Sequence, residues 1–572
     1  MSPRPAPSVD PRLLDALRAD LHAARFTVGG VESVLGPLAA AALHREQDVP
    51  AVRAAAAALA RPRPAAVAVL THAFVLGRPV ARRLLDGALP GLGVEGAVRL
   101  GLVEAAGAGA DDEVRAAVDL RPYEAVDAAG DVTWWLASDL GELQTGVRLA
   151  GDHVLGAGGA STTLAQVTMR TPVGRVLDVG TGCGIQALHA ARHARHVVAT
   201  DISARALAFA ALNVALNHAS SVAEVPLRED YFAEVPRAEG YFGERGVADV
   251  ELREGSMLEP VAGEEFDLVV SNPPFVITPH TGSPLPDYEY RDGGRSGDAV
   301  VRDLVRDVGR VLAPGGVAQL LGNWEHRRGE PWTERVGAWL DDAGLDGWVV
   351  QREVQDPAEY AETWIRDGGT TSEREPEAWA QAYGAWLDDF ASRDVEAIGF
   401  GIVTLRRPDP AGPAAGRVTL RRLEEHTGSV RQPLGGHLAA TLAAHDWLVG
   451  LGARAASSAA VDGAAPDDAA VLEALASTRL VVAGDVTEER YLTPGAADPN
   501  VVLLRQGDGF GRAVHASTAL AALTGTCDGE LTVGQISSAI AALFDVPAAD
   551  LAAELLPAVR GLVEDGFLVA SR

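Results

Sequence analysis

An Asn-Pro-Pro-Phe sequence at residues 272–275 carries the most specific chemistry in this chain. It follows Asp267–Ser271, an apolar run with β-branched residues that predicts a buried strand. Because proline has no N–H to donate to a sheet, Pro273 and Pro274 must end that strand. The carboxyl end of a strand in an open α/β sheet is where ligands bind. The sequence therefore predicts a ligand site beginning at Asn272.

These four residues suit the binding of a planar NH2 group. The side-chain oxygen of Asn272 and the backbone oxygen of Pro273 are two acceptors that can hold both hydrogens of such a group. Phe275 offers a ring on which a flat substrate can stack. A positively charged methyl donor placed in line would then complete a transfer by positioning and electrostatics. Considered alone, the motif is explained about equally well by a tight turn after a core strand.

A glycine-rich segment upstream predicts the site of the donor. The apolar strand Arg175–Val179 leads into the loop Gly180–Gly184 (Gly-Thr-Gly-Cys-Gly) and a helix that begins at Ile185. Glycines let the backbone approach a ligand closely at the amino end of a helix. Asp178 precedes the loop, and Asp201 ends the second predicted strand, where an acid can accept both ribose hydroxyls. The order of these motifs along the chain makes coincidence a poor explanation.

Residues 173 to about 325 resemble the class I S-adenosylmethionine-dependent methyltransferases of the Asn-Pro-Pro-Tyr/Phe group. This group includes release-factor glutamine N5-methyltransferases, RNA guanine N2-methyltransferases and N6-adenine methyltransferases. Val270–Thr278 is most similar to the release-factor type of archaea and eukaryotes, and Tyr290–Asp298 is similar to the Gly-Gly loop of the glutamine methyltransferases. The resemblance implies S-adenosyl-L-methionine as the cofactor. It also implies a Rossmann-like α/β domain with a seven-stranded, doubly wound sheet whose last strand is antiparallel.

Two parts of this region depart from the family. Residues 219–248 are an acidic, aromatic-bearing insertion before the predicted third strand, Val250–Arg253. After that strand, Ser256 and Met257 stand where the family usually has an acid near the adenine, and the resemblance implies that they receive its amine and pack on its ring. The predicted cofactor-binding residues are Asp178, Gly180, Thr181, Gly182, Gly184, Asp201, Ser256 and Met257, and the predicted catalytic residues are Asn272, Pro273, Pro274 and Phe275.

The sequence supports three hypotheses for the function. The preferred one is an N-methyltransferase that acts on a glutamine amide of a protein partner such as a release factor, from the motif resemblance and the acidity. The alternative is methylation of an exocyclic amine of an RNA or DNA base, guanine N2 or adenine N6, which the same motif accommodates. The net charge of −29 weakens this alternative, because proteins that grip a phosphate backbone usually carry a basic face. A lesser alternative is a non-catalytic binding scaffold, against which the intact Asn272 and glycine loop argue.

With 572 residues, the chain is too long for a single core. Residues 1–113 predict a helical, winged-helix-like domain, and residues 114–172 predict a β-containing connector. The methyltransferase domain is expected at 173–408, and residues 418–572 are expected to form a C-terminal domain ending in a second winged-helix-like module. The aromatic-rich insertion at 355–397 predicts either a cap over the site or a helical excursion with its own small core.

The composition predicts a cytoplasmic protein. Hydrophobic residues make up 47% of the chain, as in ordinary globular domains, and no apolar run reaches the roughly 18 residues needed to span a membrane. The amino terminus, Met1–Asp20, has no signal-peptide core. The two cysteines, Cys183 and Cys527, are far apart in the sequence, so neither a disulfide framework nor a Cys-based zinc site is predicted.

Overall fold

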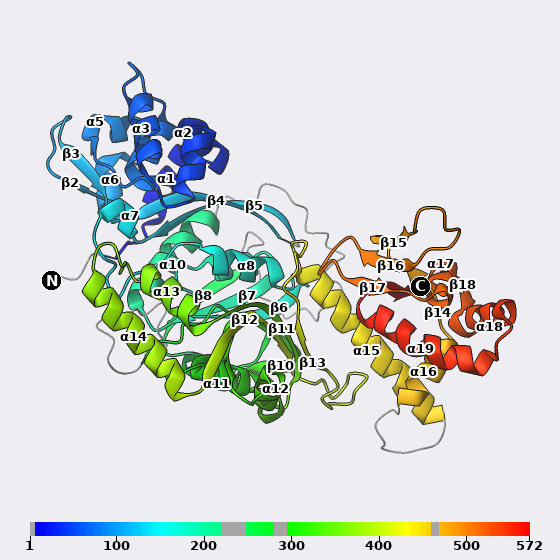
Figure 1. Ribbon diagram of the computed structural model, residues 1–572. Helices are drawn as coiled ribbons and strands as arrows, with labels where there is room; N and C mark the ends of the chain where they lie inside the picture. Colours follow the sequence, from blue (N-terminus) through cyan, green and yellow to red (C-terminus); the bar gives the residue numbers. More distant parts are fainter. Residues whose placement is uncertain (1–5, 128, 219–247, 280–293, 459–467, 572) are drawn as a thin grey trace. The chain divides into compact units, whose positions relative to one another are not determined.

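The computed structural model describes residues 6–127, 129–218, 248–279, 294–458 and 468–571. The chain forms two compact units, whose elements are labelled in Figure 1. Unit 1 consists of Met1–Ala165, Pro172–Ala343 and Gln351–Leu405, and unit 2 consists of Gln166–Thr171, Gly344–Val350 and Arg406–Arg572. Every predicted site residue therefore belongs to unit 1.

A mostly parallel sheet is the centre of unit 1. Its strand order is β11-β12-β10-β9-β6-β7-β8, and the β6–β7, β7–β8, β6–β9 and β9–β10 pairs are parallel. The bounds of these strands are β6 (Val173–Val179), β7 (Ala194–Asp201), β8 (Asp249–Glu254), β9 (Phe266–Ser271), β10 (Leu312–Arg327), β11 (Asp346–Gln355) and β12 (Val395–Arg406). An eighth strand, β13 (Arg421–Glu425), belongs with the start of β11 to unit 2; it stands next to β11 in the order and was not predicted. The predicted α/β fold class is confirmed.

The strand order brings two predicted motifs to one point of the sheet. From β6 the chain proceeds outward to β7 and β8, and it then returns to β9 on the other side of β6. Val179 and Ser271, the last residues of β6 and β9, are register partners. The glycine loop and the Asn-Pro-Pro-Phe motif therefore leave the sheet side by side. Such a reversal of strand order is a topological switch point, where open α/β sheets bind ligands.

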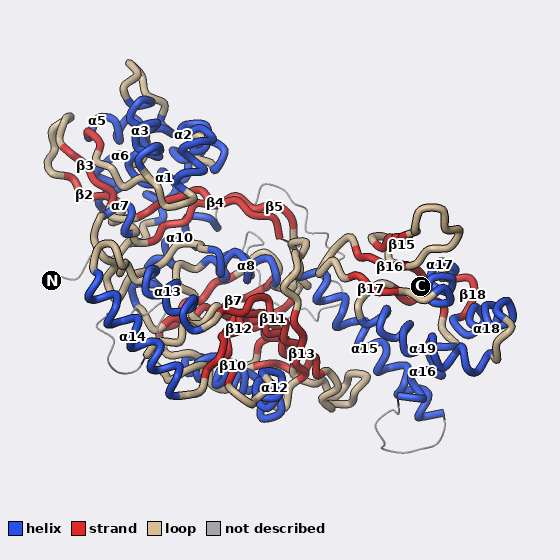
Figure 2. Tube along the Cα trace, viewed as in Figure 1, coloured by secondary structure: helices blue, strands red, loops and turns tan. Residues whose placement is uncertain are grey.

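The strand sequences explain why this sheet is parallel and covered. Val176, Leu177 and Val197 have 0% of their surface exposed, as expected for strands with helices on both faces. Figure 2 shows the strands of the sheet in red among helices in blue. The helices that contact β7 or β10 are α9 (Ile185–Ala190), α10 (Ala204–His218), α11 (Ala299–Asp307) and α12 (Trp332–Ala343).

Strand β10 runs well past its parallel partner. Its last register pair with β9 joins Leu320 to Ser271, but β10 continues to Arg327. At that end, the Arg328 N–H donates to the Asp394 carbonyl (2.9 Å), one residue before β12 begins. The end of β10 thus lies beside the start of β12, as in an antiparallel pair, which agrees with the prediction for the last strand.

The aromatic-rich insertion forms two helices, α13 (Pro357–Asp367) and α14 (Pro376–Ser392). Three of its aromatic side chains, Tyr360, Trp386 and Phe390, are at most 1% exposed and form one core. Val276 and Ile277, which directly follow the Asn-Pro-Pro-Phe motif, are buried in the same core. The insertion therefore has a core of its own, and that core also fixes the segment that follows the motif.

The residues before the sheet form a helical part and a β-hairpin. The helices are α1 (Pro11–Ala23), α2 (Val28–Leu43), α3 (Val49–Leu59), α4 (Ala66–Leu70), α5 (Arg82–Ala88), α6 (Gly93–Arg99), α7 (Glu142–Thr145) and α8 (Gly159–Val167). A small sheet has the order β1-β3-β2, with β1 (Val80–Ala81), β2 (Val103–Ala105) and β3 (Glu113–Ala116). Within the described residues, no single helix is long and apolar enough to cross a membrane. The bent pair α1–α2 passes that test by length and composition only.

Two asparagines attach the hairpin β4 (Asp119–Asp127) and β5 (Gly130–Ser138) to helix α10. Asn213 donates to the Ala137 carbonyl (2.8 Å) and accepts from the Ala137 N–H (2.7 Å). Asn217 makes the same pair of bonds with the backbone of Trp135, at 2.8 and 3.0 Å. Both side chains are buried, so the hairpin is joined to α10 by amide groups that have no water to replace their partners.

Unit 2 has its own apolar core and two three-stranded sheets, ordered β18-β14-β19 and β15-β16-β17. β16 and β17 form an antiparallel hairpin. The strands are β14 (Arg479–Val482), β15 (Val486–Tyr491), β16 (Val501–Gln506), β17 (Ala513–His515), β18 (Asp528–Thr532) and β19 (Leu568–Ala570). The helices are α15 (Gly435–Ser458), α16 (Asp468–Ala476), α17 (Thr518–Thr526), α18 (Val533–Phe544) and α19 (Ala548–Glu564).

Candidate active site

The three glycines of the loop after β6 serve two different purposes. All three have positive φ angles, 72° at Gly180, 55° at Gly182 and 86° at Gly184, which favour glycine. A Cβ atom at Gly180 or Gly182 would meet nothing within 4 Å, whereas one at Gly184 would lie 3.0 Å from the Cα of Ala210 on α10. Gly184 therefore permits helix packing, and the other two leave open space against the backbone. That space fits a cofactor lying on the loop.

Two carboxylates flank this loop. Asp178 is 1% exposed; one oxygen accepts from the Thr181 hydroxyl (2.6 Å), and the other has no partner among the described residues. Burial raises the pKa of Asp178 to about 7, and the nearby charge of Asp201 adds to the rise. A bound cation would reverse that effect by stabilising the carboxylate. Asp178 and Thr181 thus form one unit suited to a positively charged ligand.

Asp201 ends β7 and braces the loop from the neighbouring strand. Its two oxygens accept from the backbone N–H groups of Gly182 and Ser203, each at 2.9 Å. Burial raises the pKa of Asp201, and these N–H donors oppose that rise. Each carboxylate oxygen can accept a second hydrogen bond, so ribose hydroxyls can still bind here. The predicted role of Asp201 is compatible with this geometry.

Ser256 and Met257 follow β8, the next strand along the same edge. The Gly255 N–H donates to the Asp201 carbonyl (2.9 Å), which holds this turn against the end of β7. Met257 has a φ of 50°, and both side chains are half-buried. The two residues therefore follow a glycine that is hydrogen-bonded to the end of β7, and their contact with an adenine stays a prediction.

The Asn-Pro-Pro-Phe motif begins directly after β9. The Ser271 hydroxyl donates to the Val179 carbonyl (2.8 Å), which joins the ends of β9 and β6. The Asn272 side-chain oxygen is buried, and the described part of the chain offers it no donor. The Phe275 ring meets Trp364 edge-on, with 6.3 Å between centroids. An acceptor oxygen thus lies next to the glycine loop, and aromatic rings follow it.

Unpartnered polar atoms recur along this edge of the sheet. Buried side-chain oxygens of Asp178, Thr200, Asn272 and Asn323 have no hydrogen-bond donor within the described ranges. They lie at the ends of β6 and β7, directly after β9, and on the extension of β10, four adjacent strands in the sheet order. A buried oxygen without a donor costs about 1–3 kcal/mol, so four at one edge indicate that a polar ligand supplies the missing donors.

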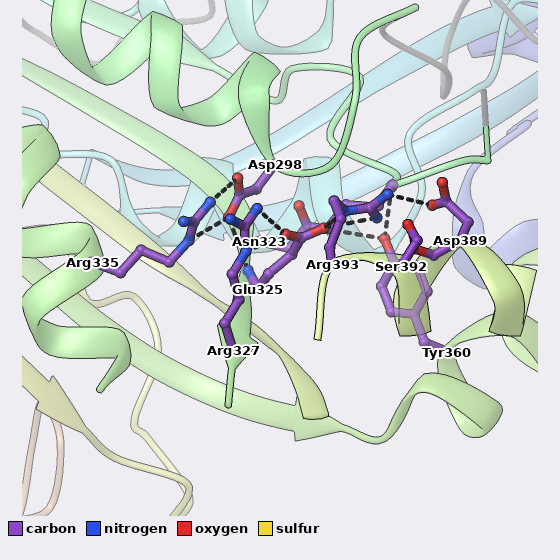
Figure 3. A network of polar contacts seen from close by, with 10 residues as sticks. Asp298, Asn323, Glu325, Arg327, Arg335, Tyr360, Asp389, Ser392 and Arg393 are labelled. Carbon is purple, nitrogen blue, oxygen red and sulfur yellow. Dashed lines mark hydrogen bonds and ion pairs between the residues drawn. The ribbon is translucent and has the colours of Figure 1, made fainter. Parts of the chain in front are cut away.

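Thr200 and Asn323 were not predicted as site residues. Figure 3 shows Asn323 beside Tyr360, whose hydroxyl accepts the Asn323 side-chain N–H (2.7 Å). The only sequence signal for Asn323 is a polar residue placed shortly after a run that predicts a buried strand, Val317–Leu321. Two other predictions lie wholly or partly outside the described residues: the insertion at 219–248 and the loop at 290–298, of which 248 and 294–298 are described.

Comparisons with known families match two parts of the chain. Residues 155–239 match the family described as "Ribosomal protein L11 methyltransferase (PrmA)". Residues 23–117 match a "Domain of unknown function (DUF7059)". The first match covers the glycine loop and Asp201, and the second falls on the helical part before the sheet. Each family match covers much less than half of the chain.

Curated relatives and solved structures are similar over part of the chain. A ribosomal protein uL3 glutamine methyltransferase of Bradyrhizobium diazoefficiens is 30% identical over 32% of this chain and 53% of its own length. A release factor glutamine methyltransferase of Deinococcus radiodurans is 33% identical over 26% of this chain and 44% of its own length. The chain thus spans about half the length of these relatives. The ribosomal protein L11 methylase structure from Lactobacillus delbrueckii subsp. bulgaricus has 20% identity and a TM-score of 0.22, over 36% of this chain and 77% of that one.

Proposed function

We propose that this protein is an S-adenosylmethionine-dependent N-methyltransferase whose acceptor is a glutamine amide of another protein. The observation that carries the proposal is the buried, unpartnered Asn272 oxygen at the switch point of the sheet, next to a glycine loop open to a ligand. The two glutamine methyltransferase relatives support the same acceptor chemistry. They also suggest the substrate class, a release factor or a ribosomal protein.

The residues of this chain would act mainly by positioning. Gly180 and Gly182 would lie against the cofactor, and the Asp178 carboxylate would bind a cationic part of it. S-adenosylmethionine supplies an electrophilic methyl group on a sulfonium. Asn272 and the Pro273 carbonyl would accept the two amide hydrogens, orient the nitrogen lone pair and raise its electron density. The nitrogen would gain the methyl carbon as the carbon–sulfur bond of the donor breaks and its electron pair returns to sulfur, and it would lose one proton to water, so both products would be neutral at the reacting atoms.

The first test is to identify the labelled product. The purified protein is incubated with S-adenosylmethionine carrying a labelled methyl group and a cell extract, and the label is then treated with protease or nuclease. We expect a protease-sensitive label that releases methylamine on acid hydrolysis, as N5-methylglutamine does. A nuclease-sensitive label would favour a nucleobase acceptor, and no label above that of the Asn272→Ala protein would favour a scaffold.

We also propose a cytoplasmic location, from the composition and the substrate class. Fractionation of cells that express the protein should recover it with the ribosomes or the soluble proteins. Recovery with the membrane fraction after a high-salt wash would overturn this proposal.

A further inference from the structure

Asn323 lies on the acceptor side of the sheet. β10 neighbours β9 on the side away from β6 and β7, the two strands that lead into the predicted cofactor residues. Asn323 is three residues beyond Leu320, the last β10 residue paired with β9. It therefore stands past the end of β9, beside the strand that carries Asn272, and away from the loops expected to bind the cofactor.

One tyrosine ties Asn323 to the Asn-Pro-Pro-Phe segment. The Tyr360 hydroxyl accepts the Asn323 side-chain N–H (2.7 Å) and also the Ile277 backbone N–H (2.9 Å). Asn323 is 0% exposed, and its side-chain oxygen meets no donor in the described chain. One N–H of the amide is thus used by Tyr360, and the oxygen is a buried acceptor that no donor of the described chain reaches.

Charged groups hold this extension of β10 rigid (Figure 3). Glu325, 0% exposed, pairs with Arg327 (2.6 Å) and with Arg393 (2.9 Å). Asp298 accepts the Glu325 backbone N–H (3.0 Å) and pairs with Arg335 (2.7 Å). These ion pairs fix the strand around Asn323, whose side-chain oxygen has no donor within the described ranges. Fixed acceptors of this kind suit recognition, because little ordering is needed on binding.

We propose that Asn323 is a second substrate-binding residue, whose side-chain oxygen accepts an N–H from the polypeptide that carries the methylated glutamine. The proposal rests on the proposed function. Asn272 and Pro273 would take both hydrogens of the reacting amide, so the donor for Asn323 is a different N–H, from the peptide backbone around that glutamine. Tyr360 is a positioning residue, since it acts through Asn323 and Ile277.

The test compares Asn323→Ala with a matched control, Asn217→Ala. Asn217 is also a buried asparagine, but its amide is fully used by the backbones of Trp135 and Asn213. With the protein substrate identified by labelling, we expect Asn323→Ala to raise KM for that substrate about 3- to 10-fold, the loss of one hydrogen bond, with little change in kcat or cofactor affinity. Asn217→Ala should lower Tm without raising KM. Tyr360→Phe should raise KM by a smaller factor, because Asn323 remains but loses its anchor.

Three results separate the outcomes. An Asn323→Ala protein with wild-type KM and kcat would overturn the inference while leaving the proposed function standing. The inference also fails if Asn217→Ala raises KM equally, since the effect would then be one of stability. If the wild-type protein labels no polypeptide, the proposed function itself fails.

Discussion

The two halves of the candidate site differ in whether backbone or side-chain groups form them. On the β6–β7 side, the ligand-facing surface is mainly backbone: two glycines with open space, and carboxylates held by N–H groups and a hydroxyl. On the β9–β10 side, it is made of side chains: two asparagine oxygens that have no donor in the part of the chain that the structure describes, and several aromatic rings. Backbone geometry suits a constant ligand such as a cofactor. Side chains can be exchanged one at a time, so the second half is where acceptor specificity would be set.

The largest expected effect separates the two halves directly. Asn272→Ala should lower kcat on the order of 10²–10³-fold, by analogy with the loss of one preorganised group from an oxyanion site. Cofactor affinity should stay almost unchanged, because Asn272 follows β9, whereas the cofactor is proposed to lie on the loops after β6 and β7. Steady-state kinetics measures the change in kcat, and calorimetry measures the cofactor affinity. A variant that methylates at the wild-type rate would show that the acceptor site lies elsewhere.

On the cofactor side, Asp201→Ala should weaken S-adenosylmethionine binding. The loss of hydrogen bonds to a charged group is worth roughly 1–3 kcal/mol, or about 5- to 150-fold in Kd. The glycine loop also loses a brace, because the Gly182 N–H donates to this carboxylate. Asp565→Ala in unit 2 also removes a paired carboxylate, and it should leave cofactor binding unaltered. Equal Kd values for wild type and Asp201→Ala would remove Asp201 from the site.

Two glycine substitutions in one loop should have different effects, one mainly on cofactor binding and the other mainly on the stability of the fold. Gly184→Ala places a Cβ against Ala210, so overpacking of about 1–3 kcal/mol adds to the left-handed strain of about 1–2 kcal/mol. Gly182→Ala carries the strain alone but projects into the open space. We expect the lower Tm in Gly184→Ala and the weaker cofactor binding in Gly182→Ala. The opposite assignment would contradict the division of roles among these glycines.

The smallest effect is a pH dependence on the cofactor side. Burial raises the pKa of Asp178 to about 7, so between about pH 4 and pH 7 the folded protein keeps a proton that the unfolded chain has released. Stability should therefore fall as pH rises through this interval, and Asp178→Asn should flatten that slope. A cationic ligand favours the charged carboxylate, so cofactor affinity should rise severalfold through pH 7 in wild type and less in Asp178→Asn. Parallel profiles for the two proteins would refute the assignment.

The backbone half of the site could be predicted from the sequence, and the side-chain half only in part. Glycines at positive φ and prolines that end a strand leave local marks, so the places of Gly180, Gly182 and Asn272 at the ends of strands could be predicted from their neighbours alone. The proposed role of Asn323 depends on the length by which β10 extends past the end of β9 and on a hydrogen bond to Tyr360, which lies 37 residues later in the sequence. Thr200 likewise gains its place from its pairing with Val179 in the next strand. Such non-local registers leave no short motif.

The same reason explains the elements that were missed or left open. β13 is short and polar, so its sequence lacks the apolar pattern of a strand, and only its place beside β11 in the sheet order reveals it. The aromatic insertion was expected either to cap the site or to form its own core. Its rings do form a core, and that core takes in Val276 and Ile277. Which apolar side chains share a core is a three-dimensional question.

The asparagine bonds between α10 and the β4–β5 hairpin limit how far this protein can be shortened. A fragment that starts at residue 173 would keep the whole parallel sheet. It would, however, expose the amides of Asn213 and Asn217 and the apolar side chains of α10 that pack against the hairpin. Helix α10 begins three residues after Asp201. If α10 were less firmly packed, the end of β7 and the Asp201 side chain would also become less well fixed. The segment outside the methyltransferase-like region is thus part of the scaffold of its cofactor edge, and the smallest self-sufficient piece must begin before Asp119.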